Sequence, residues 1–409
     1  MVIKSVKLAT ILFYLNSVFV VFCFVSCGSS PTEASSLLTA DIRGGMDKPG
    51  LLGLGDEIKG VTFVPLEVTT DDASLIDGVY DYAVTDRYIY VLPVKEPRIV
   101  LFDRQGRFIR TLVKEGQGPG EFRGILPCIQ VDERNDRLFL FSNNRVWEYT
   151  LEGEFIGQST HEYSVIYMRH IGKDRFAAIS FPFQPFNGGG FGLGLFSRKG
   201  DTIAIKNDFY SFLLPHEKSG FTTSIAPAYS DAQNSVLFKT GSNDTVFCIS
   251  ADRISAACVL DLKNSDAEVI RSLDVTDMSN LRIEKKDPKD IFVQDMIEFP
   301  GHYYFRLLYN QGYYIASVDK KTGKTLVEKC VMPGSIYELA DANLQHGMQG
   351  TRSYRNFPVW GRVIKDELVQ VVTPYELNLY KSLRSITIPQ ELDLKGEEGN
   401  PVFVFYSLI

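Results

Sequence analysis

The feature that most constrains the fold is a short motif repeated at equal spacing. Each copy has an aromatic residue, a glycine four positions later and an isoleucine three positions after that. The copies are Phe102–Ile109, Tyr149–Ile156 and Phe196–Ile203. Their glycines, at positions 106, 153 and 200, are 47 residues apart. Two apolar strands joined at a turn glycine are typical of an antiparallel hairpin, and a period of this length indicates a β-propeller blade.

Short apolar runs precede these hairpins, at Tyr88–Val91, Leu138–Phe141 and Phe176–Ile179, and each follows an Asp-Arg turn. Weaker units bring the number of blades to six. We therefore predict an all-β protein, a six-bladed propeller over residues 56–409. Because an unpaired strand edge invites aggregation, we expect Val61–Val68 to close the last blade. A pair of β-sandwiches gives no reason for the repeat, and the coils of a β-helix are much shorter.

The N-terminal 26 residues are predicted to be a secretory signal, since Lys4 and Lys7 precede the almost wholly apolar stretch Leu8–Val25. The residues that follow resemble the lipobox of bacterial lipoproteins. That resemblance implies that the Cys27 thiol is acylated, which would anchor the protein to a membrane of the cell envelope. An uncleaved anchor and an ordinary signal peptide are the alternatives. Small residues after Cys27 predict a flexible tether over residues 27–55. Periplasmic and surface display both stay open.

Two cysteines, Cys248 and Cys258, flank a predicted turn at Ala251–Arg253. A tight turn would place them opposite each other, so they are candidates for a disulfide in an exported domain. Two free buried thiols are the equally good alternative.

One proline-containing loop before the sixth blade holds four residues suited to ligand binding, which are Tyr354, Arg355, Phe357 and Trp360. Aromatic faces stack on sugar rings or apolar groups, and arginine pairs with carboxylates. The alternative is that Phe357 and Trp360 only fill the interior of the ring.

Other chemical signals are weak. The five histidines are scattered, and only His170 and His302, near the starts of predicted inner strands, are candidates to face the central channel. No metal site, cofactor or catalytic residue is predicted. A formal net charge of -7 argues against nucleic acid as a partner, because phosphate binding needs a basic surface.

The segment Gly116–Phe122, with its Gly-Pro-Gly core, resembles bacterial six-bladed β-propeller lipoproteins related to NHL-repeat and TolB-like proteins. The likeness continues through Gly194–Thr202 and Asn243–Thr245 to Asn400–Phe403. It implies the fold and export, and it says little about activity. The glycine spacing does not fit a dinucleotide loop, so we interpret Gly116–Phe122 as a turn between blades.

These observations favour a non-enzymatic binding module for a glycan, a peptide or a protein partner in the cell envelope. A hydrolase or lyase acting on an extracellular polymer is the second hypothesis, and a structural subunit of an envelope complex is the third. Converging histidines or carboxylates in the central channel would favour the enzyme. An aromatic plug would favour a scaffold, and an open aromatic-lined cleft would favour ligand capture.

Overall fold

The structure, a computed structural model, describes residues 37–48, 57–70, 73–123, 128–142, 144–161, 165–180, 183–184, 192–206, 212–213, 228–232, 234–239, 244–263, 291–310, 312–330, 361–382 and 399–409. All of these except Leu37 belong to one compact unit, Leu38–Ile409. The predicted signal segment and Cys27 lie outside the described residues. No helix within the described part of the chain is long and apolar enough to cross a membrane.

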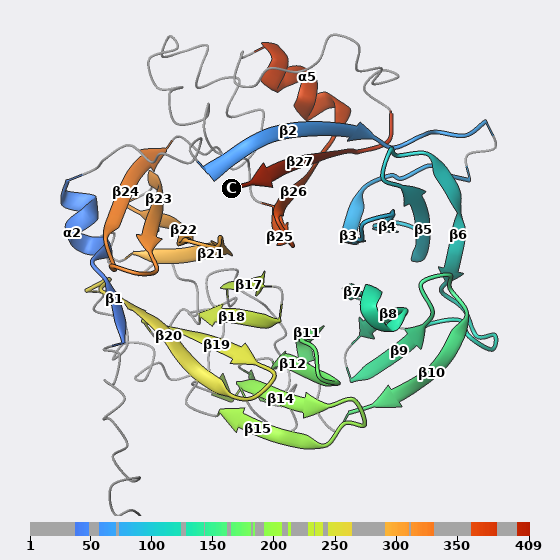
Figure 1. The fold of residues 1–409 in the computed structure, drawn as a ribbon, viewed down its shortest axis with the longest axis horizontal. Helices are drawn as coiled ribbons and strands as arrows, with labels where there is room; N and C mark the ends of the chain where they lie inside the picture. Colours follow the sequence, from blue (N-terminus) through green and yellow to red (C-terminus); the bar gives the residue numbers. More distant parts are fainter. Residues whose placement is uncertain are drawn as a thin grey trace, which may run out of the picture. The chain divides into compact units, whose positions relative to one another are not determined.

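Six sheets follow one another around a ring, as the sequence repeat predicts, and each sheet is one blade (Figure 1). In the first three blades the strands are, from the inside outward, β3 (Val79–Val84), β4 (Tyr88–Pro93), β5 (Arg98–Asp103) and β6 (Phe108–Lys114); β7 (Cys128–Asp132), β8 (Arg137–Ser142), β9 (Arg145–Tyr149) and β10 (Phe155–Thr160); and β11 (Val165–His170), β12 (Arg175–Ser180), β14 (Leu193–Ser197) and β15 (Thr202–Lys206).

The remaining blades consist of β17 (Ala228–Ala232), β18 (Ser235–Lys239), β19 (Thr245–Ser250) and β20 (Ile254–Leu260); β21 (Phe292–Glu298), β22 (His302–Tyr309), β23 (Gly312–Asp319) and β24 (Thr325–Cys330); and β25 (Arg362–Ile364), β26 (Glu367–Val372), β27 (Val402–Leu408) and β2 (Ile58–Pro65). A separate two-stranded sheet pairs β13 (Phe183–Gln184) with β16 (Phe212–Leu213). Helix α5 (Pro374–Ser382) follows β26.

The ring closes as the sequence predicts. Strand β2, which overlaps the expected Val61–Val68 segment, pairs antiparallel with β27, the last strand of the chain. Thus the sixth blade combines one strand from the start of the propeller with three from its end. Apolar side chains fill the spaces between the sheets, and the largest fully buried ones include Trp147, Tyr149 and Phe403.

A segment expected to be flexible is part of the folded unit. Strand β1 (Leu38–Ala40) pairs in parallel with β20, and helix α2 (Ile42–Asp47) follows it. Ala40 and Ile42 are fully buried in the cluster between the fourth and fifth blades. The prediction of a tether over residues 27–55 is therefore wrong for residues 38–47, because apolar side chains spaced through this stretch give it a surface to bury.

Turn glycines of the hairpins have the left-handed backbone that the motif requires. Their φ angles are 82° at Gly106, 88° at Gly153, 95° at Gly200 and 74° at Gly323. Each also lies against the outermost strand of the preceding sheet. A Cβ atom on Gly106 would lie 2.2 Å from the Pro65 carbonyl oxygen in β2, and one on Gly323 would lie 3.2 Å from the Thr39 carbonyl in β1. The repeated glycine therefore serves both the turn and the contact between blades.

The segment Gly116–Phe122 forms a structural turn after β6, which confirms the interpretation from sequence. Gly120 has a φ of 79°, and the Glu121 carboxylate accepts a hydrogen bond of 2.7 Å from the Gly118 N–H. Phe122 is fully buried and packs against Trp147. The glycines thus allow the chain to fold around the Glu121 side chain.

Cys248 and Cys258 are free thiols in the structure. The expected opposite placement is wrong, because the hairpin pairs Ile249 with Ile254, which places Cys248 opposite Ser255 and Cys258 opposite Val246. Burial raises the pKa of the Cys258 thiol to about 12, so it stays protonated and unreactive. The alternative of two free thiols is the arrangement observed.

A buried histidine at the end of the second blade predicts acid sensitivity. His161 is 3% exposed, and neither ring nitrogen has a hydrogen-bond partner among the described residues. Burial lowers the pKa of His161, so the unfolded chain binds a proton that the folded chain does not. We expect stability to fall as the pH drops below about 6.5, the ordinary value. Between pH 7 and pH 5 the melting temperature of His161→Phe should fall less than that of the wild type. An equal fall in both proteins would contradict a role of His161 in acid sensitivity.

Candidate functional site

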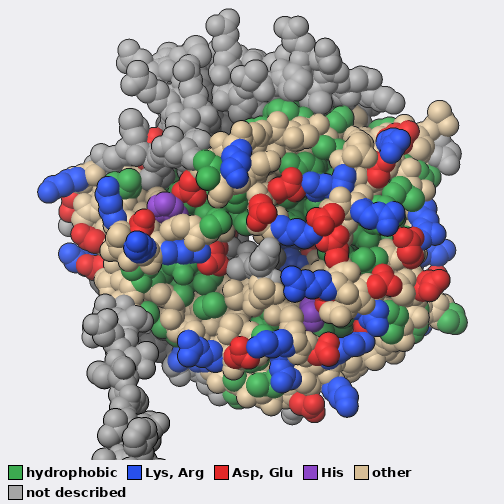
Figure 2. Space-filling model, in the orientation of Figure 1, with side chains coloured by type: hydrophobic (Ala, Val, Ile, Leu, Met, Phe, Trp, Pro, Cys, Tyr) green, Lys and Arg blue, Asp and Glu red, His purple; other side chains and the backbone are tan. Residues whose placement is uncertain are grey.

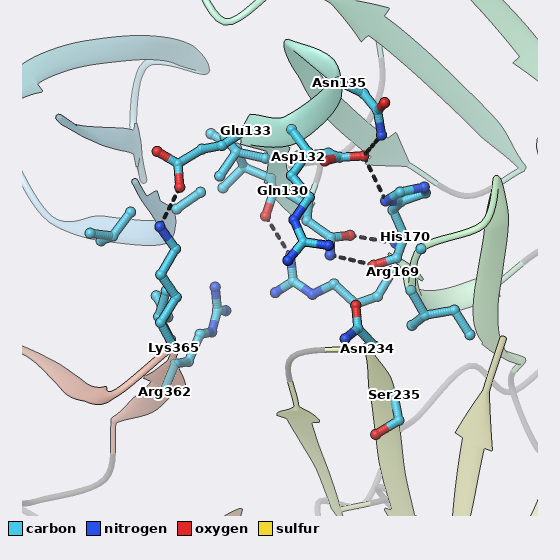
Figure 3. Close-up of a pocket in the computed structure, with 18 of the residues that line it drawn as sticks. Gln130, Asp132, Glu133, Asn135, Arg169, His170, Asn234, Ser235, Arg362 and Lys365 are labelled. Atoms are coloured by element: carbon cyan, nitrogen blue, oxygen red, sulfur yellow. Dashed lines mark hydrogen bonds and ion pairs between the residues drawn. The ribbon is translucent and has the colours of Figure 1, made fainter. Parts of the chain in front are cut away.

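A cavity of about 350 Å³ lies where the inner strands of the ring converge (Figure 3). Its walls come from β3, β7, β11 and β25, from the 3₁₀ turn η2 (Glu133–Asn135) and from Asn234 and Ser235 at the start of β18. Five of the six blades therefore contribute to one site. Figure 2 shows acidic and basic side chains interspersed around the middle of this face.

One side of the wall is held by an ion pair whose carboxylate is buried. Asp81 of β3 is 3% exposed and pairs with Arg362 of β25, whose guanidinium also donates to the Tyr82 carbonyl at 2.9 Å. The other Asp81 oxygen accepts a hydrogen bond of 2.7 Å from the Ile129 N–H in β7. A register shift between Val79 and Asp81 marks a bulge in β3 at this point. Bulges re-aim side chains, and here one carboxylate joins three inner strands.

The other side of the wall joins β7 to β11. The Gln130 side-chain amide bonds both backbone groups of His170: its nitrogen donates to the carbonyl at 2.6 Å, and its oxygen accepts from the N–H. Arg169, which is 3% exposed, donates to the Ile129 carbonyl and, at 2.8 Å, to the Tyr167 hydroxyl. We call Asp81, Arg362, Gln130 and Arg169 the inner-strand network. It holds four blades in register around the cavity.

His170, one of the two histidines named from sequence as candidates to face the central channel, is among the residues that line the cavity. Its ring stacks on Phe139 at 5.1 Å between centroids and meets Phe176 edge-on at 5.4 Å. Its Nδ1 lies 3.6 Å from the Asp132 carboxylate. Burial lowers the pKa of His170, although the charge of Asp132 opposes this effect. The imidazole is therefore neutral near pH 7, and its side chain is only 7% exposed.

The second candidate histidine lies elsewhere. His302 begins β22, and the residues that line the cavity do not include it. Its Nδ1 is 2.8 Å from Glu57, directly before the closing strand β2, and Tyr304 donates a 2.6 Å hydrogen bond to the same carboxylate oxygen. This cluster joins the fifth blade to the start of β2, so the two histidines do not form one site.

An ion-pair cluster borders the cavity on the side of the first and sixth blades. The Lys365 ammonium lies 2.5 Å from both Asp86 and Glu133, and the Asp86 N–H donates to Glu133 at 2.9 Å. Burial acts to lower the pKa of Lys365, but the hydrogen bonds to Asp86 and Glu133 raise it above its usual value. Lys365 therefore remains charged. Figure 3 shows Lys365 and Glu133 on one side of the space and Asp132, Asn135 and His170 grouped on the other.

Several predicted site residues lie outside the described part of the chain, including Cys27, Tyr354, Arg355, Phe357 and Trp360. Sequence reasoning missed the residues that the structure brings together, which include Arg134, Asn234 and Lys365. Each is an ordinary polar residue of a turn, and only the ring topology makes them neighbours. Within the described ranges, no group of three or more His, Cys, Asp or Glu is arranged to hold a metal ion.

One family model and several solved structures are similar to this chain, and the first structure below shares its fold. A family model described as a domain of unknown function, DUF4934, matches residues 37–407. No curated protein matches the sequence. A solved structure from Bacteroides fragilis NCTC 9343, of a protein named as exported, has a TM-score of 0.63 at 14% identity and covers 91% of this chain and 99% of its own. A protein of unknown function from Bacteroides caccae has a TM-score of 0.34 at 12% identity, covering 66% and 84%.

Proposed function

We propose that this chain, which belongs to the DUF4934 family, is an exported binding module that holds one polar group of a glycan, peptide or protein ligand in its central cavity. The observation that carries the proposal is the cavity itself: about 350 Å³, within the usual range for ligand sites, and lined by charged and amide side chains from five blades. Such a volume suits a single sugar or amino-acid residue of a larger ligand.

The contacts of His170 support binding rather than catalysis. A histidine near a carboxylate in the channel is the arrangement that would favour a hydrolase or lyase. Here both backbone groups of His170 are held by Gln130, and its ring packs between Phe139 and Phe176. A general base must reach the proton that it removes, and a ring that is 7% exposed is poorly placed for this. His170 is better explained as part of the wall.

Two variants of equal bulk test the cavity. Asn234 is exposed and lines the cavity, so the larger side chain of Asn234→Trp would fill the space. Gln105→Trp places the same side chain on an exposed hairpin turn outside the cavity lining. On glycan and peptide arrays we expect Asn234→Trp to lose at least tenfold in affinity for whatever the wild type retains. Gln105→Trp should bind normally. Full binding by Asn234→Trp would place the ligand site elsewhere.

Export and membrane attachment are part of the proposal. They are supported by the apolar stretch Leu8–Val25 ahead of Cys27, and by the similar fold of a protein named as exported. With Cys27 acylated, Cys27→Ala should move the protein from the membrane to the soluble fraction on cell fractionation. If the same share of Cys27→Ala as of the wild type stays with the membranes, lipidation at Cys27 is refuted.

The loop with Tyr354, Arg355, Phe357 and Trp360 is proposed as a second contact surface for the same ligand. Aromatic and arginine side chains of this kind add stacking and carboxylate contacts to a polar site. Trp360→Ala should weaken array binding of any ligand that reaches beyond the cavity, whereas unchanged affinity for every bound ligand would exclude the loop.

A further inference from the structure

Some of the charged side chains that line the cavity already have partners, and others do not. Five cationic residues line it, Arg134, Arg169, Lys173, Arg362 and Lys365, against two carboxylates, Asp132 and Glu133. Three of the cations have carboxylate partners: Arg362 pairs with Asp81, Lys365 with Asp86 and Glu133, and Lys173, in a largely exposed pair, with Asp252 at 3.1 Å. Arg169 is buried in the inner-strand network. An anion would bind to these groups only in competition with their present partners.

The two carboxylates are engaged as well. One oxygen of Glu133 accepts from Lys365 and the other from the Asp86 N–H. Asp132 accepts a 2.7 Å hydrogen bond from Asn135, and its side chain is 14% exposed. The charge that is available at the cavity is therefore positive.

Arg134 is that available cation. Its side chain is exposed at the cavity, and among the residues that the structure describes it makes no hydrogen bond or ion pair. The backbone beneath it is fixed: it lies in the middle of η2, where Asn135 bonds to Asp132 and Arg137 donates to the Asn135 carbonyl at 2.7 Å. The fixed turn places the start of the Arg134 side chain at the cavity, and the planar fork of a guanidinium matches a carboxylate.

We infer that the cavity binds a uronic acid residue of a saccharide, with its carboxylate on Arg134. This inference rests on the proposed binding function. One carboxylate suits one free guanidinium, whereas a sulfated or phosphorylated chain with several charges would need further cations, and the others that line the cavity are already paired or hydrogen-bonded. The sugar hydroxyls can bond to Asn234 and Ser235 at the start of β18, which also line the cavity. A peptide carboxyl terminus would also reach Arg134 but lacks the hydroxyls that the other polar groups are suited to bind.

Isothermal titration with defined trisaccharides tests the inference. The probes are trigalacturonic and triglucuronic acid, their carboxyl-reduced counterparts galactotriose and glucotriose, and tripeptides with free or amidated carboxyl termini. The proteins are the wild type, Arg134→Gln, Arg134→Lys and the control Arg107→Gln, whose side chain is 74% exposed and lies outside the cavity lining.

We expect a uronic trisaccharide to bind the wild type at least tenfold more tightly than its reduced counterpart, and less tightly as salt is raised. Arg134→Gln should remove that preference, Arg134→Lys should keep part of it, and Arg107→Gln should change nothing. Equal binding of acidic and reduced saccharides, or a preference for free tripeptide carboxyl termini, would overturn the uronic acid inference while leaving a cavity ligand in place. If no probe binds in an Asn234→Trp-sensitive way and no ligand on the arrays does so either, the proposed function fails too.

Discussion

Replacing Asp81 by leucine should lower the free energy of unfolding by about 1–3 kcal/mol, the usual cost of leaving a buried hydrogen-bonding group without its partner. Asp81→Leu leaves the Arg362 guanidinium, whose side chain is 28% exposed, without its carboxylate, and leaves the Ile129 N–H without its acceptor. Because these groups join β25, β3 and β7, the loss should appear in unfolding of the ring as a whole. Chemical denaturation followed by tryptophan fluorescence measures it, since Trp147 is buried in the second blade.

The matched control is a surface carboxylate that also pairs with an arginine. Glu152 and Arg110 have side chains that are 55% and 50% exposed, and exposed pairs contribute about 0–1 kcal/mol. Glu152→Leu should therefore cost much less than Asp81→Leu. Equal losses for the two variants would mean that the inner-strand network does not hold the blades together.

A second large effect on stability is expected where the turn of the first hairpin packs against the closing strand β2. Gly106→Ala forces a side chain into a φ of 82°, and its Cβ would lie 2.2 Å from the Pro65 carbonyl. The left-handed backbone alone costs about 1–2 kcal/mol for a residue with a side chain, and displacing β2 adds to this. We therefore expect the free energy of unfolding, measured in urea, to fall by more than about 2 kcal/mol.

Gly60→Ala is its control within β2. Gly60 has no atom within 4 Å of its would-be Cβ and no positive φ, so the change should stay within about 0.5 kcal/mol. A Gly106→Ala protein as stable as Gly60→Ala would refute the proposed contact between the hairpin and the closing strand.

The repeat predicts the ring because the 47 residues between successive hairpins are the length of one blade. The glycine in each copy is needed because the turn has a positive φ. Closure by Val61–Val68 follows from the same reasoning, since an open edge has to be paired. The role of Leu38–Ala40 could not be predicted. Three residues are too few to show a period, and their partner β20 is more than 200 residues away in the chain. The partner of Cys248 was missed because the pairing register depends on which residues form the turn, and a shift of the turn changes every pair in the hairpin.

The candidate site was even less accessible from sequence. His170 was a candidate because it lies near the start of a predicted inner strand, but Arg134 and Lys365 lie in separate turns with no motif around them. They become neighbours only because β7 and β25 both face the middle of the ring. Polar residues at the ends of inner strands are common to every blade, so their number alone does not identify those that bind.

Hydrogen–deuterium exchange of the purified protein with and without trigalacturonic acid tests the central claim most directly, because it locates the ligand on the chain. The turn amides at the cavity, in η2, at Asn234–Ser235 and around Lys365, should exchange more slowly with the saccharide present. The outer strands β6, β10 and β15 should be unaffected. Protection confined to the outer strands, or absent from all three cavity turns, would contradict a binding site at the centre of the ring.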